Sequence, residues 1–114
     1  MRILLIDDDP AVLEVVGLLL AADGHEVITA SSGLAGLTRL EQGAAVELVL
    51  TDLAMPDMSG WEVVRAVRRR WPQLRVGIVT GTPQYLEDQE EPVDVLILKP
   101  VVLAALRQAL ARLA

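Results

Sequence analysis

Five short apolar runs divide the chain, and each is rich in Val, Ile and Leu. The runs are almost continuous rather than alternating, which is typical of parallel strands that are covered on both faces of a sheet. The sequence therefore predicts five buried strands. These strands are Ile3–Ile6, Val27–Ala30, Val46–Thr51, Val76–Thr80 and Val93–Leu98.

Helical patterns separate the runs. The first, Pro10–Ala22, follows Asp9 as a candidate N-cap and has Pro at its first position, where the missing N–H costs nothing. Gly24 lies just past its end. Three further segments carry apolar residues at helical spacing. Their stripes are Leu34, Leu37 and Leu40; Val64, Val67 and Trp71; and Leu106, Leu110 and Leu113.

The connection between the fourth and fifth strands is the weakest helical segment. Residues 81–92 contain four acidic residues and few apolar ones, and Pro92 must end any helix there. We therefore expect the fourth helix to be short, acidic and loosely held.

Alternation of strands and helices defines an α/β fold. We predict a doubly wound, five-stranded parallel sheet of the flavodoxin-like kind, with strand order 2-1-3-4-5 and right-handed crossovers. In this order the first and third strands are neighbours. The chain has 114 residues, which suits a single domain.

Polar residues follow the carboxyl ends of the strands, where ligand sites lie in open parallel sheets. Asp7 and Asp8 follow the first strand, and Asp52 follows the third. The fourth strand ends in Thr80, and Lys99 follows the fifth. The strand order therefore brings three carboxylates together, with a hydroxyl and an ammonium group beside them.

Three clustered carboxylates repel one another. Two unit charges at about 4 Å cost on the order of 4 kcal/mol at an effective dielectric constant near 20. A proton or a cation must relieve this repulsion. Because the cluster offers only oxygen ligands, it favours a hard ion such as Mg²⁺ over zinc. A carboxylate beside Mg²⁺ and a lysine is also well placed to accept a phosphoryl group.

The composition of the chain limits the kinds of partner and the cellular compartment that we expect for it. The net charge of −6 argues against direct binding of nucleic acid. No apolar run is long enough to span a membrane, and the N-terminus runs straight into acidic residues, unlike a secretory signal. With no cysteine there is no disulfide, and we expect a cytoplasmic location. The chain has nine arginines but a single lysine, Lys99, which follows the fifth strand. His25 is expected at the surface, away from the carboxylate cluster.

Four motifs occur in order at these strand ends. They are Ile-Leu-Leu-Ile-Asp-Asp-Asp-Pro at 3–10, Leu-Val-Leu-Thr-Asp-Leu-Ala-Met-Pro-Asp-Met-Ser-Gly at 48–60, Ile-Val-Thr-Gly at 78–81 and Leu-Lys-Pro at 98–100. Together they make the chain resemble, over residues 1–114, the receiver domain of two-component response regulators.

The resemblance implies a phosphorelay role. Asp52 would accept a phosphoryl group from a phosphohistidine on a sensor histidine kinase or a phosphotransfer protein. Asp8 would ligate Mg²⁺ directly, Asp7 would act mainly through water, and the backbone carbonyl of Ala54 would complete the protein ligands. Such a protein would only phosphorylate and dephosphorylate itself, and would act on a downstream effector or a C-terminal output domain.

The resemblance also assigns the remaining polar residues. Lys99 would pair with the phosphoryl oxygens, and Thr80 would move to form a hydrogen bond with one of them. The peptide bond between Lys99 and Pro100 is expected to be cis. Asp57 is interpreted as a loop acid near the site rather than a ligand.

Two positions depart from the family pattern. Receivers usually carry Tyr or Phe three residues before the lysine, where this chain has Leu96, and often Phe after Lys-Pro, where it has Val101. These positions and the curtailed fourth helix lie on the side that similar proteins use for dimerisation or output. We therefore expect intact phosphorylation chemistry with an altered readout.

Three alternatives remain. A receiver-like scaffold could bind partners without being phosphorylated, although the complete polar set argues against it. An aspartyl phosphatase resembling the haloacid dehalogenase superfamily would use the Asp-x-Asp spacing of Asp7 and Asp9, but Pro10 and the short chain count against it. A flavodoxin-like flavin carrier has the right fold, but the first loop lacks a Ser, Thr or Gly phosphate cradle.

Overall fold

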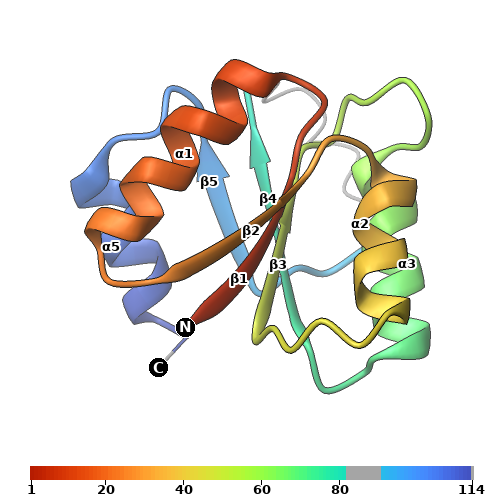
Figure 1. Ribbon diagram of the computed structural model, residues 1–114. Coiled ribbons are helices and arrows are strands. Elements are labelled where there is room, and N and C mark those ends of the chain that lie inside the picture. The colour runs from red at the N-terminus through yellow and green to blue at the C-terminus, as the bar shows by residue number, and fades with distance from the viewer. Residues whose placement is uncertain (82–90, 114) are drawn as a thin grey trace.

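The computed structural model describes residues 1–81 and 91–113, and its strands and helices alternate along the chain. The elements are β1 (Arg2–Ile6), α1 (Pro10–Ala22), β2 (Glu26–Ala30), α2 (Gly33–Glu41), β3 (Leu48–Thr51), α3 (Gly60–Arg70), β4 (Arg75–Thr80), β5 (Val95–Leu98) and α5 (Leu103–Ala111). Figure 1 shows a sheet between two layers of helices, with α1 and α5 on one face and α2 and α3 on the other.

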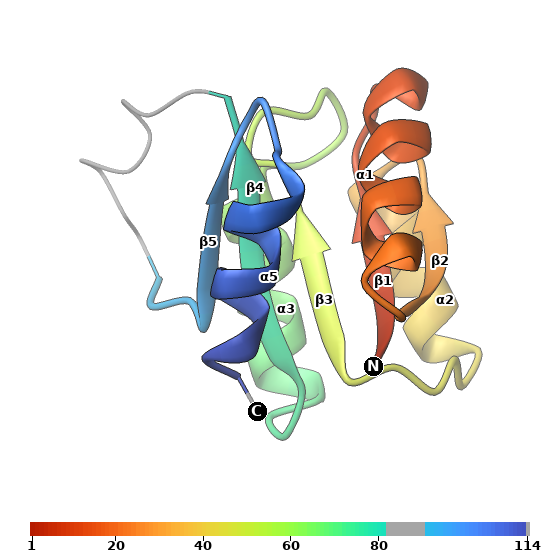
Figure 2. The same ribbon diagram turned by 90° about the vertical axis from the view of Figure 1, so that its left-hand side faces the viewer.

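The five strands form one parallel sheet in the order β2-β1-β3-β4-β5, which confirms the predicted fold class and strand order. Figure 2 shows the strands side by side with their carboxyl ends at the same edge. Ile6 pairs with Thr51 across β1 and β3, and Thr80 pairs with Leu98 across β4 and β5. The residues that follow these pairs therefore leave the sheet close together.

The core consists of two layers, one on each face of the sheet. Along β1, Leu4 and Ile6 belong to the layer beneath α2 and α3, whereas Ile3 and Leu5 belong to the layer beneath α1 and α5. All four are essentially inaccessible to solvent. Both faces of β1 are thus apolar, as expected for a strand covered on both sides, and β3 is likewise fully buried. The expectation of burial on both faces is wrong for the two edge strands: β5 alternates buried and exposed residues, and β2 is only partly buried.

Some boundaries and contacts differ from the prediction. β3 begins at Leu48 and β5 at Val95, each two residues later than expected. Leu34, expected on the buried stripe of α2, is 66% exposed. The helix instead approaches the sheet through Gly36, where a Cβ would overlap the Ile6 side chain. The close approach of α2 to the sheet at Gly36 turns Leu34, two residues earlier, toward solvent.

The expected fourth helix lies in residues 82–90, outside the described residues. The segment just before β5, which contains Pro92 and Asp94, is bound to α3. The Arg68 guanidinium donates to the Pro92 carbonyl at 2.8 and 3.1 Å, and it lies 3.5 Å from a carboxylate oxygen of Asp94. Asp94 in turn accepts a hydrogen bond from the Val76 N–H at 2.9 Å. These contacts fix the start of β5 relative to α3 and β4.

His25 is half-buried rather than a surface residue, although it lies away from the acidic cluster as expected. Its Nδ1 is 2.9 Å from the N-terminal amine of Met1, and its Nε2 is 3.0 Å from Asp23. These contacts join β1 to the turn before β2. Among the described helices, none combines the length and the apolar character needed to cross a membrane.

Candidate functional site

The backbone of the sheet places two aspartates next to each other. The N–H of Asp7 donates to the Ala30 carbonyl at 3.1 Å, and that of Asp52 donates to the Ile6 carbonyl at 3.0 Å. These bonds extend the ladders of β1 with β2 and of β1 with β3 by one residue. The positions of both side chains therefore follow from strand pairing.

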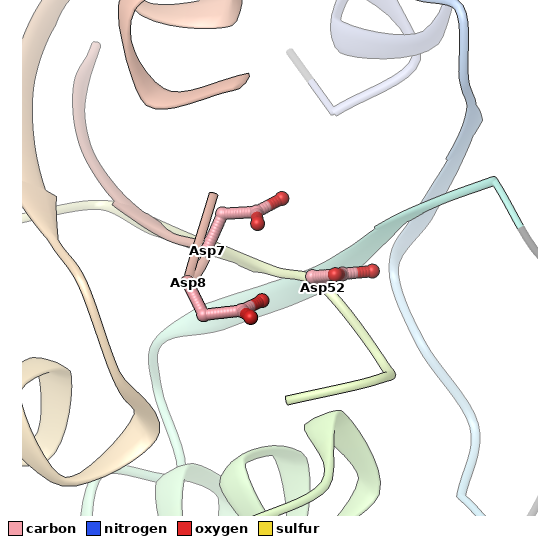
Figure 3. Close-up of side chains that lie close together, drawn as sticks. All are labelled: Asp7, Asp8 and Asp52. Carbon is pink, nitrogen blue, oxygen red and sulfur yellow. The ribbon is translucent and has the colours of Figure 1, made fainter. Parts of the chain in front are cut away.

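Asp7, Asp8 and Asp52 form a carboxylate cluster at this edge of the sheet (Figure 3). Each supplies one oxygen, and these oxygens lie within 4.8 Å of one another. Asp7 is 2% exposed and Asp52 is 7% exposed, whereas Asp8 lies at the surface. The predicted gathering of the three acids is thus present, with two of them buried and one open to solvent.

Lys99 lies against the two buried carboxylates. Its Nζ is 2.8 Å from Oδ2 of Asp7 and 3.6 Å from Oδ2 of Asp52. Its backbone N–H donates to the Thr80 carbonyl at 2.9 Å, which holds the end of β5 beside the end of β4. A single ammonium group is therefore shared between two carboxylates of the cluster.

The remaining oxygens of the buried acids accept backbone hydrogen bonds. Oδ1 of Asp52 accepts from the Leu53 N–H at 2.8 Å, and Oδ1 of Asp7 accepts from the Asp9 N–H at 2.9 Å. Asp9 itself accepts from the Ala11 N–H at 2.9 Å as the N-cap of α1, as predicted. Each buried carboxylate is thus oriented by a backbone N–H on one oxygen and faces Lys99 with the other.

The electrostatic environment shifts two of these groups. Burial, followed by the negative charge of Asp7, raises the pKa of Asp52 despite the opposing effect of Lys99. Burial on its own disfavours the charged form of Lys99, but its hydrogen bond to Asp7 and the charge of Asp52 outweigh it and raise the pKa of the lysine. The cluster therefore holds excess negative charge that one lysine only partly neutralises.

The other predicted residues lie at the same edge. Thr80 is fully buried at the end of β4. Ala54 is exposed in the loop two residues beyond Asp52. The peptide bond between Lys99 and Pro100 is cis, as expected.

The carboxylate cluster offers only oxygen atoms as metal ligands, which fits a hard divalent ion such as Mg²⁺. The exposed Asp8 leaves the cluster accessible from solvent.

Comparison with protein families and curated proteins identifies relatives. The chain matches the model of the response regulator receiver domain over residues 3–111. It is 36% identical over 112 residues to the transcriptional regulatory protein GlrR of Escherichia coli, covering 96% of this chain and 25% of that protein. It is 34% identical over 114 residues to the sensor histidine kinase RcsC of Salmonella typhi, covering 97% of this chain and 12% of that protein. The chain thus spans a quarter or less of the length of these two relatives.

Solved structures of similar fold agree. The response regulator TrrA of Thermotoga maritima, solved in complex with Mg²⁺-BeF, gives a TM-score of 0.91 at 28% identity and covers 99% of this chain and 98% of that one. A receiver domain protein from Clostridium thermocellum gives 0.84 at 33% identity, with coverages of 96% and 90%. The chain therefore belongs to the response regulator receiver family, whose members act in phosphorelay signalling. This assignment separates it from the phosphatase and flavin-carrier alternatives.

One contact near the site is not indicated by any pattern in the sequence. Asp57 accepts hydrogen bonds from the Leu34 N–H at 2.9 Å and the Gly33 N–H at 3.3 Å. Its carboxylate thus caps the N-terminus of α2 from the loop that follows β3. No local pattern joins Asp57 to residues 23 and 24 positions earlier, and Ser32 already provides the local N-cap of α2.

Proposed function

We propose that this chain accepts a phosphoryl group on the Asp52 carboxylate from a phosphohistidine of a sensor histidine kinase or a phosphotransfer protein. The observation that carries the proposal is the cluster of Asp7, Asp8 and Asp52, whose oxygens lie within 4.8 Å, with Lys99 against its buried side. Residues 1–114 act as a single receiver domain in this scheme.

Mg²⁺ fits the oxygen donors of the cluster. Asp8 and Asp52 would hold it directly, Asp7 mainly through water, and the Ala54 carbonyl would complete the protein ligands. When bound, the ion supplies positive charge that offsets the charge of the phosphoryl oxygens. Burial and then the charge of Asp7 raise the pKa of Asp52, so the ionised carboxylate lies in a desolvated, negatively charged environment that a cation would stabilise.

The residues of the chain then perform the transfer. An oxygen of Asp52 attacks the phosphorus atom, the phosphorus–nitrogen bond of the phosphohistidine breaks, and the imidazole leaves with the bonding electron pair. The Leu53 N–H bound to Oδ1 holds the carboxylate in a fixed orientation and leaves Oδ2 as the candidate nucleophile. Lys99 lies 3.6 Å from that oxygen, where it would pair with a transferred phosphoryl group.

Thr80 would supply a further hydrogen bond to the phosphoryl group. Its position at the end of β4 places it beside the end of β5, where Lys99 is anchored to its carbonyl. A movement of Thr80 on phosphorylation would therefore act on the edge of the sheet formed by β4 and β5.

The partners follow from this chemistry. A phosphohistidine donor is made from ATP, so we place the chain in the cytoplasm with its kinase. The relatives include a transcriptional regulator and a sensor kinase. A downstream effector or an attached output domain would read the phosphorylated state. The acidic net charge of −6 supports a protein partner rather than direct contact with nucleic acid.

Intact-mass measurement after incubation with acetyl phosphate and Mg²⁺ tests the proposal. We expect one added phosphoryl group on the wild-type chain, and none on Asp52→Asn or in EDTA. Glu14→Gln keeps the site intact and provides a control for loss of an exposed acidic side chain on α1. No added mass on the wild-type chain would support a scaffold that binds partners without phosphorylation.

A further inference from the structure

The loop between β3 and α3, residues 52–59, carries both the proposed acceptor and the proposed carbonyl ligand. At its start, Leu53 is buried and its carbonyl accepts a hydrogen bond from the Gly60 N–H at 2.9 Å. At its end, Ser59 caps α3 in a capping box with Glu62. Both ends of the loop are therefore fixed to the fold.

The middle of the loop lacks such support. In the described part of the chain, the backbone of residues 54–56 makes no hydrogen bond. Ala54 and Pro56 are exposed. The Met55 side chain packs against the core layer beneath α2 and α3. The span that contains the Ala54 carbonyl is therefore held by that side chain and by what precedes and follows it, and by no hydrogen bond of its own backbone among the described residues.

Asp57 is the first residue after this span to be anchored. Its carboxylate oxygens accept from the N–H groups of Leu34 at 2.9 Å and Gly33 at 3.3 Å, the first residues of α2. Asp57 is exposed, and the slight desolvation that opposes ionisation of its carboxylate is outweighed by those N–H groups, which lower the pKa of Asp57. The carboxylate is therefore ionised at neutral pH and held at the positive end of a helix dipole.

A second contact fastens the loop at the same place. The Met58 side chain lies against Gly33, where a Cβ would overlap its Cγ and Sδ atoms. The loop is thus fixed to the first residue of α2 by a charged hydrogen-bonded contact and by direct packing. Because α2 is packed on the sheet through Leu37 and Leu40, this anchor is rigid.

We infer that Asp57 is a positioning residue for the metal site: its contact with the start of α2 holds the span 54–56 so that the Ala54 carbonyl stays in place. This inference rests on the proposed function, since it concerns the carbonyl ligand of the proposed Mg²⁺ site. Loss of the anchor would let the span sample other conformations, and each binding event would then have to order it.

Calorimetric titration with Mg²⁺ alone tests the inference. We expect Asp57→Ala to weaken Mg²⁺ binding about tenfold, in the range seen when supports of metal ligands are removed. Ser32→Ala is the matched control, because the Ser32 side chain caps the same helix through the Ala35 N–H at 3.0 Å and makes no hydrogen bond to the loop among the described residues. It should change the Mg²⁺ affinity less than twofold while lowering stability to a similar extent in urea.

Asp57→Asn separates positioning from charge. It removes the same negative charge as Asp57→Ala but keeps an oxygen that accepts one N–H, so it should retain most of the wild-type affinity. Lower backbone order parameters for Ala54 and Met55 in Asp57→Ala without metal, measured by NMR relaxation, would provide independent support. Equal losses in the Ala and Asn variants, or equal effects of Asp57→Ala and Ser32→Ala, would overturn the inference. A wild-type chain that binds no Mg²⁺ would overturn the proposed function as well.

Discussion

Asp52 is subject to two opposing demands. A nucleophilic carboxylate must be ionised, yet burial and the nearby charge of Asp7 raise its pKa. Lys99 offsets part of the unfavourable charge, because its Nζ lies 2.8 Å from an oxygen of Asp7 and 3.6 Å from an oxygen of Asp52. The same electrostatic imbalance that costs stability without metal is what would favour a divalent cation.

Removing the Asp52 carboxylate, the proposed acceptor, should therefore stabilise the metal-free fold. The folded pKa of Asp52 is raised above its unfolded value, so its ionisation destabilises the native state above that folded pKa. We expect Asp52→Asn to raise the free energy of unfolding at pH 7 by about 1 kcal/mol, since Lys99 offsets most of the repulsion. The gain should vanish as the pH falls toward 3.8, the ordinary value for Asp. Urea unfolding between pH 7 and pH 4 measures it, and a less stable variant at pH 7 would contradict it.

Removing the lysine should have the opposite effect. Lys99→Ala leaves two buried carboxylates without their cation, and we expect a loss of about 2 kcal/mol at pH 7. Saturating Mg²⁺ should restore part of that loss by supplying charge to the same cluster. Arg69→Ala, which removes an exposed cation from α3, serves as the control and should change stability by less than about 0.5 kcal/mol. Equal effects of the two substitutions in urea unfolding would argue against the predicted role.

At the scale of elements, β5 joins the site to the edge of the sheet. Its residues alternate between buried and exposed, and Leu96 and Leu98 are 42% and 49% exposed. The end of β5 is bonded to the end of β4 through Lys99 and Thr80, so a movement of Thr80 could reach this surface. Leu96 has no ring that could rotate to report such a movement.

We therefore expect a muted response at this edge. In NMR spectra, addition of beryllofluoride with Mg²⁺ should shift the amides around Asp52 strongly and those of residues 95–98 weakly. Leu96→Tyr, which restores the aromatic residue usual in similar receivers, should enlarge the shifts in β5 without altering those near Asp52. Shifts in wild-type β5 as large as those beside Asp52 would show that the readout is conventional. The other expected departure, a short fourth helix, falls on residues 82–90 outside the described chain.

For the whole molecule, the proposed metal site would link Mg²⁺ binding to folding. The carboxylates come from the ends of β1 and β3, and Lys99 follows β5, so the cluster exists only in the folded chain. A ligand that binds only the native state stabilises it in proportion to the logarithm of its concentration. The melting temperature should therefore depend on Mg²⁺.

At a Mg²⁺ concentration one hundred times the dissociation constant, the expected stabilisation is about 2.7 kcal/mol. For a domain of this size that corresponds to a rise in melting temperature of roughly 10 °C. Differential scanning calorimetry with and without EDTA measures the change. Asp8→Asn removes the exposed carboxylate and should abolish most of the rise, whereas identical melting curves for the wild-type chain would rule out a native-state site.

The sequence by itself determined the strand and helix types, the strand ends and the acids placed there. These features depend on local period and chain order: buried parallel strands require continuous apolar runs, and their carboxyl ends meet at one edge. The sequence alone therefore predicts that Asp7, Asp8, Asp52 and Lys99 lie together, as they do in the structure.

Only the tertiary structure decided how the elements touch. Leu34 is exposed because α2 approaches the sheet through Gly36, and Asp57 caps α2 because the loop after β3 lies over Gly33. His25 is half-buried because the N-terminus and Asp23 both reach it. Most of these contacts join residues more than twenty positions apart or depend on which face of a helix meets the sheet, and the short-range contact of His25 with Asp23 forms where the N-terminus also reaches the ring. They follow from packing, which no local pattern of hydrophobic and polar residues specifies.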